Sequence, residues 1–444
     1  MQSFFSALDG REPERDAEGI ARAIGRLVSD GELDAGDKLP PIRTVATHLG
    51  VSSSTVAAAW SIMRRHGLIR TDRRRGTTVR PFASHGRNRY WQVPNTGRRL
   101  DLDLSTGTPD PELLPPLEPI LAKVQADLDV TSYLDPPVLP DLDEELRRRW
   151  PYDPPALTVV DGANDGLDRV IGTVVRLGDV VVVEDPTYPM LLDQLELAAA
   201  EIVGVRLDDE GPRLDDLAAA LDRNPAAVVI QTGGHNPTGT VLTPVRAKAI
   251  AALMAGNDVV IIEDDHVGAM VEGTTVSLGT ELPDRVYRIQ SFSKIYGPDL
   301  RVAALAGPVE GIDTIQRRRQ MGPGWTSRLI QRILLELFAD DDVARLVADA
   351  AEIYASRRGE LGRQLNRRGL TVRVGDGMNL WVPVQSEQLT TVGLAADGIG
   401  VSPGAPFRVQ SSEPHIRVTA TNVRSDFAAV ADAIATAAHP NSHR

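Results

Sequence analysis

The chain contains no cysteine among its 444 residues, which excludes disulfide bonds and thiolate metal sites and agrees with a reducing compartment. It also lacks an uninterrupted apolar segment of the ~20 residues that a membrane-spanning helix needs. The first residues, Met1-Gln2-Ser3-Phe4-Phe5, lack the basic region and long apolar run of a signal peptide. We therefore expect a cytoplasmic protein without a membrane partner, and we assign no metal ligands.

Lysine is scarce, with only four among the 48 lysine and arginine residues, so each lysine position is informative. The net charge of -13 is unevenly spread, because residues 1–80 hold 13 basic against 10 acidic side chains whereas the remainder is acidic. The length and an apolar content of 42% allow two or three domains. The charge distribution predicts that the first domain has a different surface and a different partner.

Residues 1–80 carry the pattern of a small helical domain. An apolar helical stripe runs from Ile20 to Val28, a second helix begins at Pro41 and ends before Gly50, and a third begins among the hydroxyls of residues 52–55. Two helices joined by a short turn that contains glycine predict a helix-turn-helix, whose second helix can lie in the major groove of DNA.

Two short predicted strands, residues 68–71 and 77–79, follow the third helix and are joined by a segment with three consecutive arginines, Arg73, Arg74 and Arg75. A hairpin with such a tip is suited to phosphate contacts, which add affinity but little reading of the base sequence. The segment therefore predicts a basic wing beside the helix-turn-helix.

This first domain resembles the winged-helix domain of GntR-type regulators. The matching residues are Gly36-Asp37-Lys38-Leu39-Pro40, Arg43, Ala46, Leu49-Gly50-Val51, Thr55-Val56, Gly67-Leu68-Ile69 and Gly76-Thr77, which cover nearly all of residues 11–80. The resemblance implies that double-stranded DNA is bound by Arg43, Ser52, Ser53, Ser54, Thr55, Arg73, Arg74 and Arg75. Ser53 stands where the family usually has an arginine, and serine cannot make the bidentate contact with guanine, so the operator sequence stays open. The alternative is a DNA-binding fold kept as a dimerisation or docking module.

Residues 81–101 lack helical or alternating periodicity, contain glycine, proline and asparagine, and are rich in arginine. This composition predicts a linker between two modules that move relative to each other.

From about residue 160, short β-branched runs alternate with longer amphipathic stretches. The runs are residues 180–183, 227–230, 259–262, 286–289 and 302–305. Such alternation predicts a largely parallel sheet wrapped by helices, with ligands at the carboxyl ends of the strands.

Lys294 lies just past one of these predicted strands, with Asp264 thirty positions upstream and Arg301 seven positions downstream. Chemistry on an aldehyde cofactor needs an amine, a carboxylate that keeps the pyridine nitrogen protonated, and donors for a phosphate. The constellation predicts a pyridoxal 5'-phosphate site in which Lys294 forms a Schiff base and Asp264 pairs with the ring nitrogen. Ser291, Ser293 and Arg301 would hold the phosphate. The two acidic residues that flank Asp264 are its competitors.

The arrangement resembles fold type I, aspartate aminotransferase-like enzymes. The resemblance implies that Asn236, in an Asn-Pro-Thr-Gly turn, donates to the ring hydroxyl and that Tyr188 stacks on the ring as part of the catalytic set. Ala163 and Asn164 precede a helix rich in leucine and valine, and their backbone amides can present donors to the phosphate at its start.

The same resemblance implies a homodimer in which Tyr133 reaches the phosphate of the partner subunit. It also implies that Arg417 clamps the α-carboxylate of a ligand, since a planar guanidinium suits a planar carboxylate.

Two residues of this chain depart from the pattern of the family. His266 replaces the usual tyrosine and, as an imidazole, is expected to titrate near neutrality while still bonding the ring hydroxyl. Met190 replaces an arginine found in some regulators of this type, which disfavours a dicarboxylate ligand.

A GntR-type winged helix (11–80), a linker (81–101) and an aminotransferase-like domain (102–444) form the architecture of the MocR regulators, which the chain resembles across nearly its whole length. The large lobe is expected at about 126–309, and the small lobe at about 102–125 and 310–444. The resemblance implies a transcriptional regulator that senses pyridoxal phosphate itself or an amine or amino acid. Two alternatives remain: an active aminotransferase with a vestigial or autoregulatory head, and a regulator that has lost its cofactor.

Overall fold

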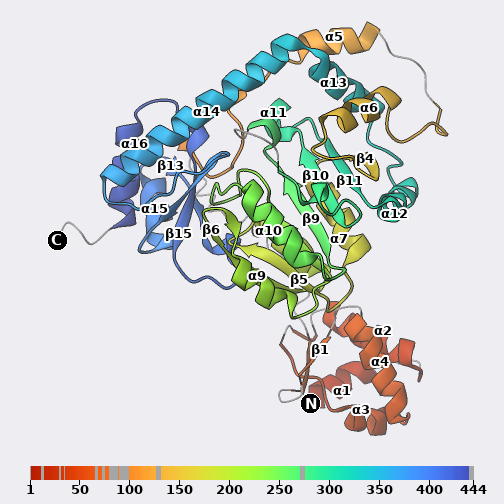
Figure 1. Ribbon diagram of the computed structural model, residues 1–444. Coiled ribbons are helices and arrows are strands. Elements are labelled where there is room, and N and C mark those ends of the chain that lie inside the picture. The colour runs from red at the N-terminus through yellow and green to blue at the C-terminus, as the bar shows by residue number, and fades with distance from the viewer. Residues whose placement is uncertain are drawn as a thin grey trace. The chain divides into compact units, whose positions relative to one another are not determined.

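The structure is a computed structural model, and it describes residues 2–11, 15–29, 32–34, 36–65, 69–72, 76–79, 89, 100–126, 132–270 and 276–439. The chain divides into two compact units, Met1–Gly86 and Arg87–Arg444 (Figure 1). The expected boundaries at 11–80, 81–101 and 102–444, and those of the two lobes, stay predictions.

The first unit is a winged helix-turn-helix, which confirms the predicted fold of this part. Its elements are α1 (Gln2–Asp9), α2 (Ala17–Ser29), α3 (Ile42–Leu49), α4 (Ser53–Arg65), β1 (Ile69–Asp72) and β2 (Gly76–Val79). Gly50 ends α3 with a φ of 65°, which a residue without Cβ adopts readily, so the chain turns at once into α4. The antiparallel pair β1–β2 forms the wing, with Ile69 opposite Val79.

The core of this unit comes from the inward faces of all four helices. Its largest fully buried side chain is Trp60 of α4, which lies in one cluster with Ile24 of α2 and Val45 of α3. Helix α1 was not predicted from the sequence, yet Leu8 of α1 is fully buried in the same cluster. The described part of the head therefore includes a fourth helix beyond the predicted three.

The second unit has the predicted fold, an α/β domain of the type I aminotransferase class. Its helices are α5 (Glu118–Ala126), α6 (Pro140–Arg149), α7 (Ala163–Val174), α8 (Pro189–Leu197), α9 (Leu214–Leu221), α10 (Pro244–Met254), α11 (Ser293–Tyr296), α12 (Val309–Gln320), α13 (Arg328–Ala339), α14 (Asp341–Arg367), α15 (Glu387–Ala396) and α16 (Phe427–Ala438). Its strands are β3 (Leu102–Asp103), β4 (Ala156–Val160), β5 (Val180–Asp185), β6 (Glu201–Asp208), β7 (Gly211–Pro212), β8 (Ala227–Ile230), β9 (Val260–Asp265), β10 (Val286–Ser291), β11 (Ala303–Gly307), β12 (Asn379–Pro383), β13 (Ile399–Gly400), β14 (Ser402–Pro403) and β15 (His415–Thr419).

Eight strands form the central sheet in the order β4-β11-β10-β9-β8-β5-β6-β7. The strands from β10 through β6 pair in parallel, whereas β11 runs antiparallel to both of its neighbours. The prediction of a largely parallel sheet is therefore confirmed, although β9 begins at Val260 and β11 at Ala303, one residue later than expected.

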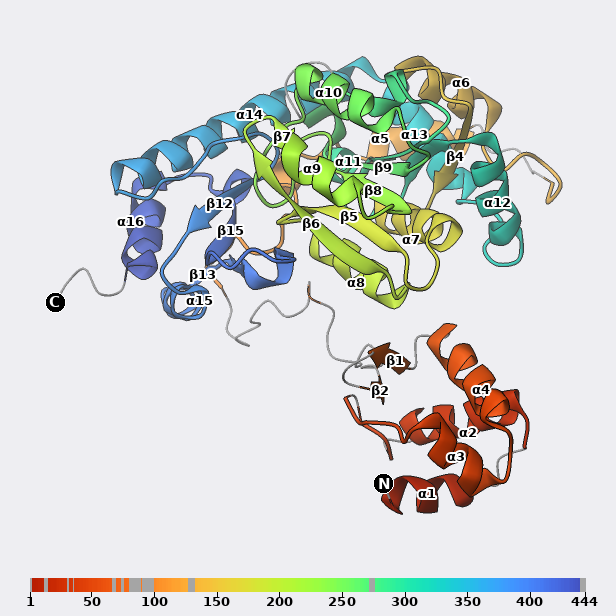
Figure 2. The same cartoon turned by 60° about the horizontal axis from the view of Figure 1, so that its bottom comes forward.

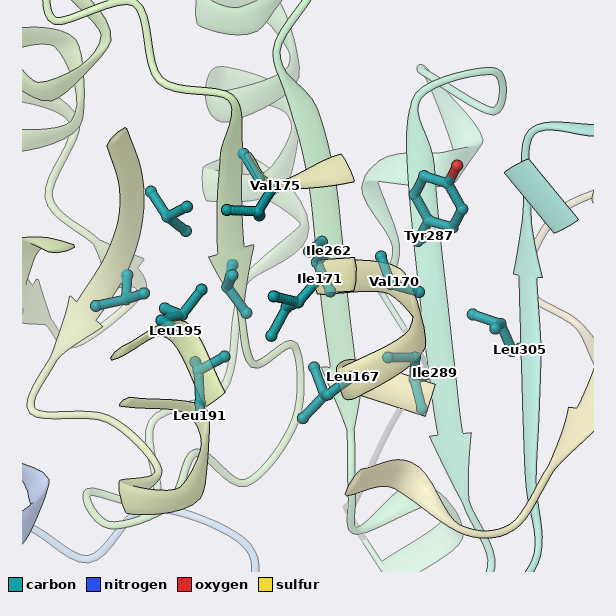
Figure 3. Packing of buried hydrophobic residues seen from close by; sticks show 14 of the residues in the cluster. Leu167, Val170, Ile171, Val175, Leu191, Leu195, Ile262, Tyr287, Ile289 and Leu305 are labelled. Atoms are coloured by element: carbon teal, nitrogen blue, oxygen red, sulfur yellow. The ribbon is translucent and has the colours of Figure 1, made fainter. Parts of the chain in front are cut away.

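Successive residues of the central strands alternate between two cores, as the two-residue period of a strand requires. Val181 and Val183 of β5 pack with α7 and α8, while Val182 packs on the other face with α9 and α10. Figure 3 shows Leu167, Val170 and Ile171 of α7 above the strands that carry Ile262 and Ile289. The sheet is thus covered on both faces, which leaves the carboxyl ends of its strands for a site (Figure 2).

A smaller, separate sheet of three antiparallel strands, β12-β15-β14, lies near the carboxyl end of the chain and has its own core with α15 and α16. Asp185, at the end of β5, joins this region to the central sheet. Its carboxylate accepts bonds from the backbone amides of Val409, Gln410 and Ser411 at 3.1, 2.9 and 2.8 Å. These contacts bring β15 and its arginine toward the ends of the central strands.

Candidate cofactor-binding site

One pocket lies at the carboxyl ends of β5, β8, β9 and β10, and it has an empty volume of about 850 Å³ including its open mouth. The residues that line it are Thr106, Gly107, Ala163, Asn164, Tyr188, Asn236, Asp264, His266, Ser291, Ser293, Lys294, Pro298, Arg301, Met378, Asn379 and Arg417. The structure therefore brings together every side chain named from the sequence for this site except Tyr133.

Lys294 lies in the first turn after β10, on the short helix α11, where its ammonium donates to the carbonyl of Gly107 at 2.5 Å. Burial, together with the positive charges of Arg417 and Arg301, lowers the pKa of Lys294 to about 8. A larger share of this amine is neutral near physiological pH than for an exposed lysine. The side chain is therefore suited to attack an aldehyde.

The three consecutive acidic residues of β9 point to alternate faces of the strand. Arg288 of β10 pairs with Glu263 at 3.0 Å and with Asp265 at 2.7 Å, and all three side chains are buried. Asp264, between the two acids, is directed instead into the pocket. The alternation leaves Asp264 as the acid of this run that can face a ligand.

Asp264 is a buried carboxyl group that faces the pocket. Burial raises its pKa to about 7, aided by the negative charges of Asp265 and Glu184. Its Oδ1 atom is buried and has no hydrogen-bond partner within the described part of the chain. An unsatisfied buried acceptor is costly, and a protonated pyridine nitrogen would supply both the missing donor and the opposite charge. The acid therefore fits the cofactor that the sequence predicts.

The start of α7 forms the other end of the pocket. Gly162 precedes the helix with a φ of +96°, and the Arg301 guanidinium lies against it, donating to the carbonyl of Asp161 at 3.3 Å. A Cβ atom on Gly162 would lie 2.6 Å from Nη2 of Arg301, so this close approach requires glycine. Ala163 and Asn164 are the first residues of α7, where amide donors and the helix dipole favour an anion.

Two serines complete this end. Ser291 and Ser293 are buried in the turn from β10 into α11. The Ser293 hydroxyl donates to the carbonyl of Leu300 at 3.1 Å, and its amide donates to Oγ of Ser291 at 3.4 Å. Together with Arg301 and the α7 amides, these groups form a cradle of the kind that a phosphate needs.

The remaining wall carries aromatic and amide side chains. The Tyr188 hydroxyl accepts from Nδ2 of Asn164 at 3.3 Å, which fixes the ring beside the phosphate cradle. Burial lowers the pKa of His266 to about 3, aided by the charges of Lys294, His235 and Arg417. The expectation that His266 titrates near neutrality is thus wrong, because the imidazole is desolvated and surrounded by cations. Its Nδ1 atom is buried and has no hydrogen-bond partner among the residues described.

Arg417, on β15, reaches the same pocket from the smaller sheet. Its guanidinium donates to Oδ1 of Asn236 at 3.3 Å and to the carbonyl of Ser105, and it lies 5.1 Å from the centroid of the Phe407 ring. Only 2% of the side chain is exposed. Ser105 and Gly107 were not predicted from the sequence, because they act through backbone carbonyls, which no side-chain pattern reveals.

Tyr133 does not line the pocket. Its side chain is 90% exposed, and its ring lies 6.0 Å from that of Trp325. The role of Tyr133 in a partner subunit stays a prediction.

Five of the residues predicted to contact DNA, Arg43, Ser52, Ser53, Ser54 and Thr55, lie among the described residues of the head. Ser52 accepts from the amide of Thr55 at 3.0 Å, and its hydroxyl also bonds those of Ser54 and Thr55, so it caps the start of α4. Ser53 and Arg43 are exposed. Arg73, Arg74 and Arg75 lie outside the described residues. All of these DNA contacts stay predictions.

Comparisons with known proteins also divide the chain into a DNA-binding part and an aminotransferase-like part. The family described as "Aminotransferase class I and II" matches residues 101–434, and the family described as "Bacterial regulatory proteins, gntR family" matches residues 16–79. The fold and these matches define a class, the DNA-binding transcription regulators that carry an aminotransferase-like domain. Within that class, the chain belongs to the MocR-type family of GntR regulators.

Its relatives match most of its length. The chain is 32% identical over 415 residues to the vitamin B6 salvage pathway transcriptional repressor PtsJ of Salmonella typhimurium. The aligned region covers 91% of this chain and 94% of that protein. The chain is also 27% identical over 378 residues to the pyridoxine biosynthesis transcriptional regulator PdxR of Corynebacterium glutamicum, covering 79% of each.

Solved structures show the same fold in enzymes. The second unit is similar to an archaeal alanine:glyoxylate aminotransferase, with a TM-score of 0.70 and 23% identity over 78% of this chain and 92% of that one. It is also similar to the α-aminoadipate aminotransferase LysN of Thermus thermophilus, with a TM-score of 0.68 and 21% identity over 76% and 92%. Among the helices that the structure describes, none combines the length and apolar character required to cross a membrane.

Proposed function

We propose that this regulator holds pyridoxal 5'-phosphate on Lys294 and that occupancy of the pocket changes its affinity for an operator. The observation that carries the proposal is the pairing, in one pocket, of an amine with a lowered pKa and a buried carboxyl group whose Oδ1 has no donor in the described chain. A regulator would then use its enzyme-like pocket to sense a bound ligand.

Each part of the pocket has a defined task in this proposal. When bound, pyridoxal phosphate supplies an aldehyde and an electron-withdrawing ring. Lys294 provides the amine for a Schiff base, and Asp264 holds a proton on the ring nitrogen. His266, neutral because its pKa is lowered to about 3, offers a hydrogen-bonding nitrogen to the ring hydroxyl without a second charge.

The anionic end is handled by a separate group of residues. Arg301, Ser291, Ser293 and the amides of Ala163 and Asn164 bind the phosphate, while Tyr188 packs on the ring. This arrangement favours a phosphorylated vitamer over pyridoxal, because the Arg301 cation and the first amides of α7 line the end of the pocket where the phosphate would lie.

The effector is either pyridoxal phosphate itself or an amine or amino acid that reacts with it. The names of the relatives PtsJ and PdxR connect both of them to vitamin B6, which supports the vitamer as effector. Arg417 leaves room for the second possibility, since it would bind the carboxylate of an amino acid in place of the Ser105 carbonyl. The protein would act in the cytoplasm as a homodimer, with one head for each half-site of the operator.

The test compares operator binding by the purified protein with and without pyridoxal phosphate. DNA retained from a genomic library identifies the operator, and gel shifts then measure the affinity ratio. We expect a ratio different from one in the wild type and equal to one in Lys294→Ala. The same ratio in both proteins would overturn the proposed sensing site.

A second candidate, an active aminotransferase, is favoured by one observation. Arg417 and Asn236 lie together beside Lys294, as required for a substrate carboxylate next to the reacting amine. Incubation with a panel of amino acids and a keto acid acceptor separates the two functions. Many turnovers per site would establish an enzyme, whereas a single stoichiometric reaction favours the sensor.

A further inference from the structure

We propose that Arg89 is an ionic anchor that fixes the linker to helix α8 and so sets the reach of the DNA-binding head. Its backbone amide donates to Oδ2 of Asp193 at 3.0 Å, and Nη1 donates to Oδ1 of Asp193 at 2.5 Å. Nη1 also donates to Oε2 of Glu196 at 3.0 Å, and Nη2 donates to the other oxygen of that carboxylate. One linker residue thus makes four hydrogen bonds to two acids of a single helix.

The geometry of α8 explains why these contacts form. Asp193 and Glu196 are three residues apart on the helix, so they lie on the same face and present two carboxylates to one planar guanidinium. The side chains of Arg89 and Asp193 are only 25% and 17% exposed. An isolated surface ion pair contributes little, but a bidentate network that also holds a backbone amide fixes the position of the chain.

The helix that receives the anchor lies beside the pocket. It begins at Pro189, directly after Tyr188, and Nε2 of Gln194 donates to the carbonyl of Asn164 at 2.9 Å. Gln194 of α8 therefore contacts a residue that lines the pocket, and Asp193 and Glu196 of the same helix hold the linker. The linker is attached to the element that lies against the phosphate cradle.

The anchor shortens the part of the linker that can move freely with the head, because only the residues before Arg89 remain untethered. Ten residue steps separate Val79, the last residue of β2, from Arg89, whereas 21 steps separate it from Leu100. A fully extended chain spans at most about 3.5 Å per residue, so the head can lie about 35 Å from the anchor but about 70 Å from Leu100 if the anchor is lost. The acids of α8 thus halve the distance over which a head can search for its half-site.

This inference goes beyond the proposed function and does not need a bound cofactor, so its test is a distance measurement. The absence of cysteine allows a clean pair of spin labels at Thr71→Cys, an exposed residue of β1, and Leu197→Cys, at the end of α8, where the leucine is 70% exposed. Labelled protein is diluted with an excess of unlabelled protein, so that distances within one chain dominate.

In the labelled parent protein we expect no population beyond about 35 Å plus the short offsets of the two label sites. Arg89→Ala should extend the distribution beyond that limit, toward about 70 Å. The pair Asp193→Asn with Glu196→Gln should extend it equally, and so should 1 M salt, which reduces the Debye length to about 3 Å. Arg99→Ala is the matched control, because it removes the same charge from the same linker, and it should leave the distribution unchanged.

Circular dichroism and a pyridoxal phosphate titration check that the variants keep the fold and the pocket. Identical distributions for Arg89→Ala and the parent would overturn the anchor, and so would an equal extension in Arg99→Ala. Because no readout here depends on an effector, a failure of the proposed sensing function would appear in the gel shifts and leave these distances unaffected.

Discussion

Gly162→Ala tests the phosphate cradle at its tightest point. The added Cβ would lie 2.6 Å from Nη2 and 2.9 Å from Cζ of Arg301, distances that real Cβ atoms do not adopt. The guanidinium must therefore move away from the start of α7. Hydrogen bonds to a charged group contribute about 1.5–3 kcal/mol. Losing those of Arg301 should weaken pyridoxal phosphate binding by roughly 10- to 150-fold.

The assay is a pair of absorbance titrations, one with pyridoxal phosphate and one with pyridoxal, which has no phosphate. We expect the variant to lose affinity for the first and to keep its affinity for the second, because the amine and the ring contacts are unchanged. The ratio of the two dissociation constants isolates the phosphate from any general loosening of the site.

A matched control removes the effect of backbone strain. Gly178 also has a positive φ, +84°, but a Cβ atom there meets nothing within 4 Å. Gly178→Ala therefore carries a similar backbone cost, about 1–3 kcal/mol, without a clash. If Gly162→Ala and Gly178→Ala discriminate equally between the two vitamers, Arg301 does not hold the phosphate and the assignment of this end of the pocket is wrong.

Three further predictions concern other residues. The rate at which Lys294 captures pyridoxal phosphate should rise with pH, reach half of its maximum near pH 8 and level off above about pH 9, because only the neutral amine attacks and its pKa is lowered to about 8. A half-maximal rate near pH 10 in stopped-flow absorbance, as for an exposed lysine, would contradict this prediction. Asp264→Asn should stabilise the cofactor-free protein, and this effect should grow from pH 4 to pH 8. The folded-state pKa of Asp264 is raised to about 7, so the folded wild type becomes less stable relative to its unfolded state as pH rises through that window. A thermal melt at pH 8 in which the wild type is more stable than the variant would refute the burial argument. Arg43→Ala should weaken binding to all DNA sequences alike and reduce the slope of log affinity against log salt by about 1, and an unchanged slope in a salt titration would remove Arg43 from the DNA interface.

The amount that could be predicted from the sequence differs between side-chain chemistry and tertiary surroundings. Lys294 and Asp264 were found because an aldehyde cofactor demands an amine and an acid, and the strand period of two explains why Asp264, not its neighbours, faces the pocket. The pKa of His266 depends on burial and on cations that come from distant segments, so no local pattern indicates it. Gly107 acts through a backbone carbonyl, which leaves no side-chain signal.

The same limit applies to the fold. The predicted runs located five strands to within a few residues, because β-branched residues buried on both faces give a strong signal. Helix α1 was missed, since its eight residues form a short pattern whose apolar face makes sense only against α2. The Arg89 contacts join residues about a hundred positions apart, and a linker rich in arginine gives no indication of which one is held.

Helix α14 is long and straight enough to act as a lever (Figure 1). Its 27 residues span about 40 Å at 1.5 Å per residue, and Ala350 and Tyr354 near its middle pack against Val267 and Met378, next to the pocket residues His266 and Asn379. A tilt of about 5° imposed there would displace an end about 20–30 Å away by roughly 2 Å, by simple geometry of a rigid rod. One dye near the end of this helix and a second dye on the central sheet would therefore report such a tilt as a change in the distance between them.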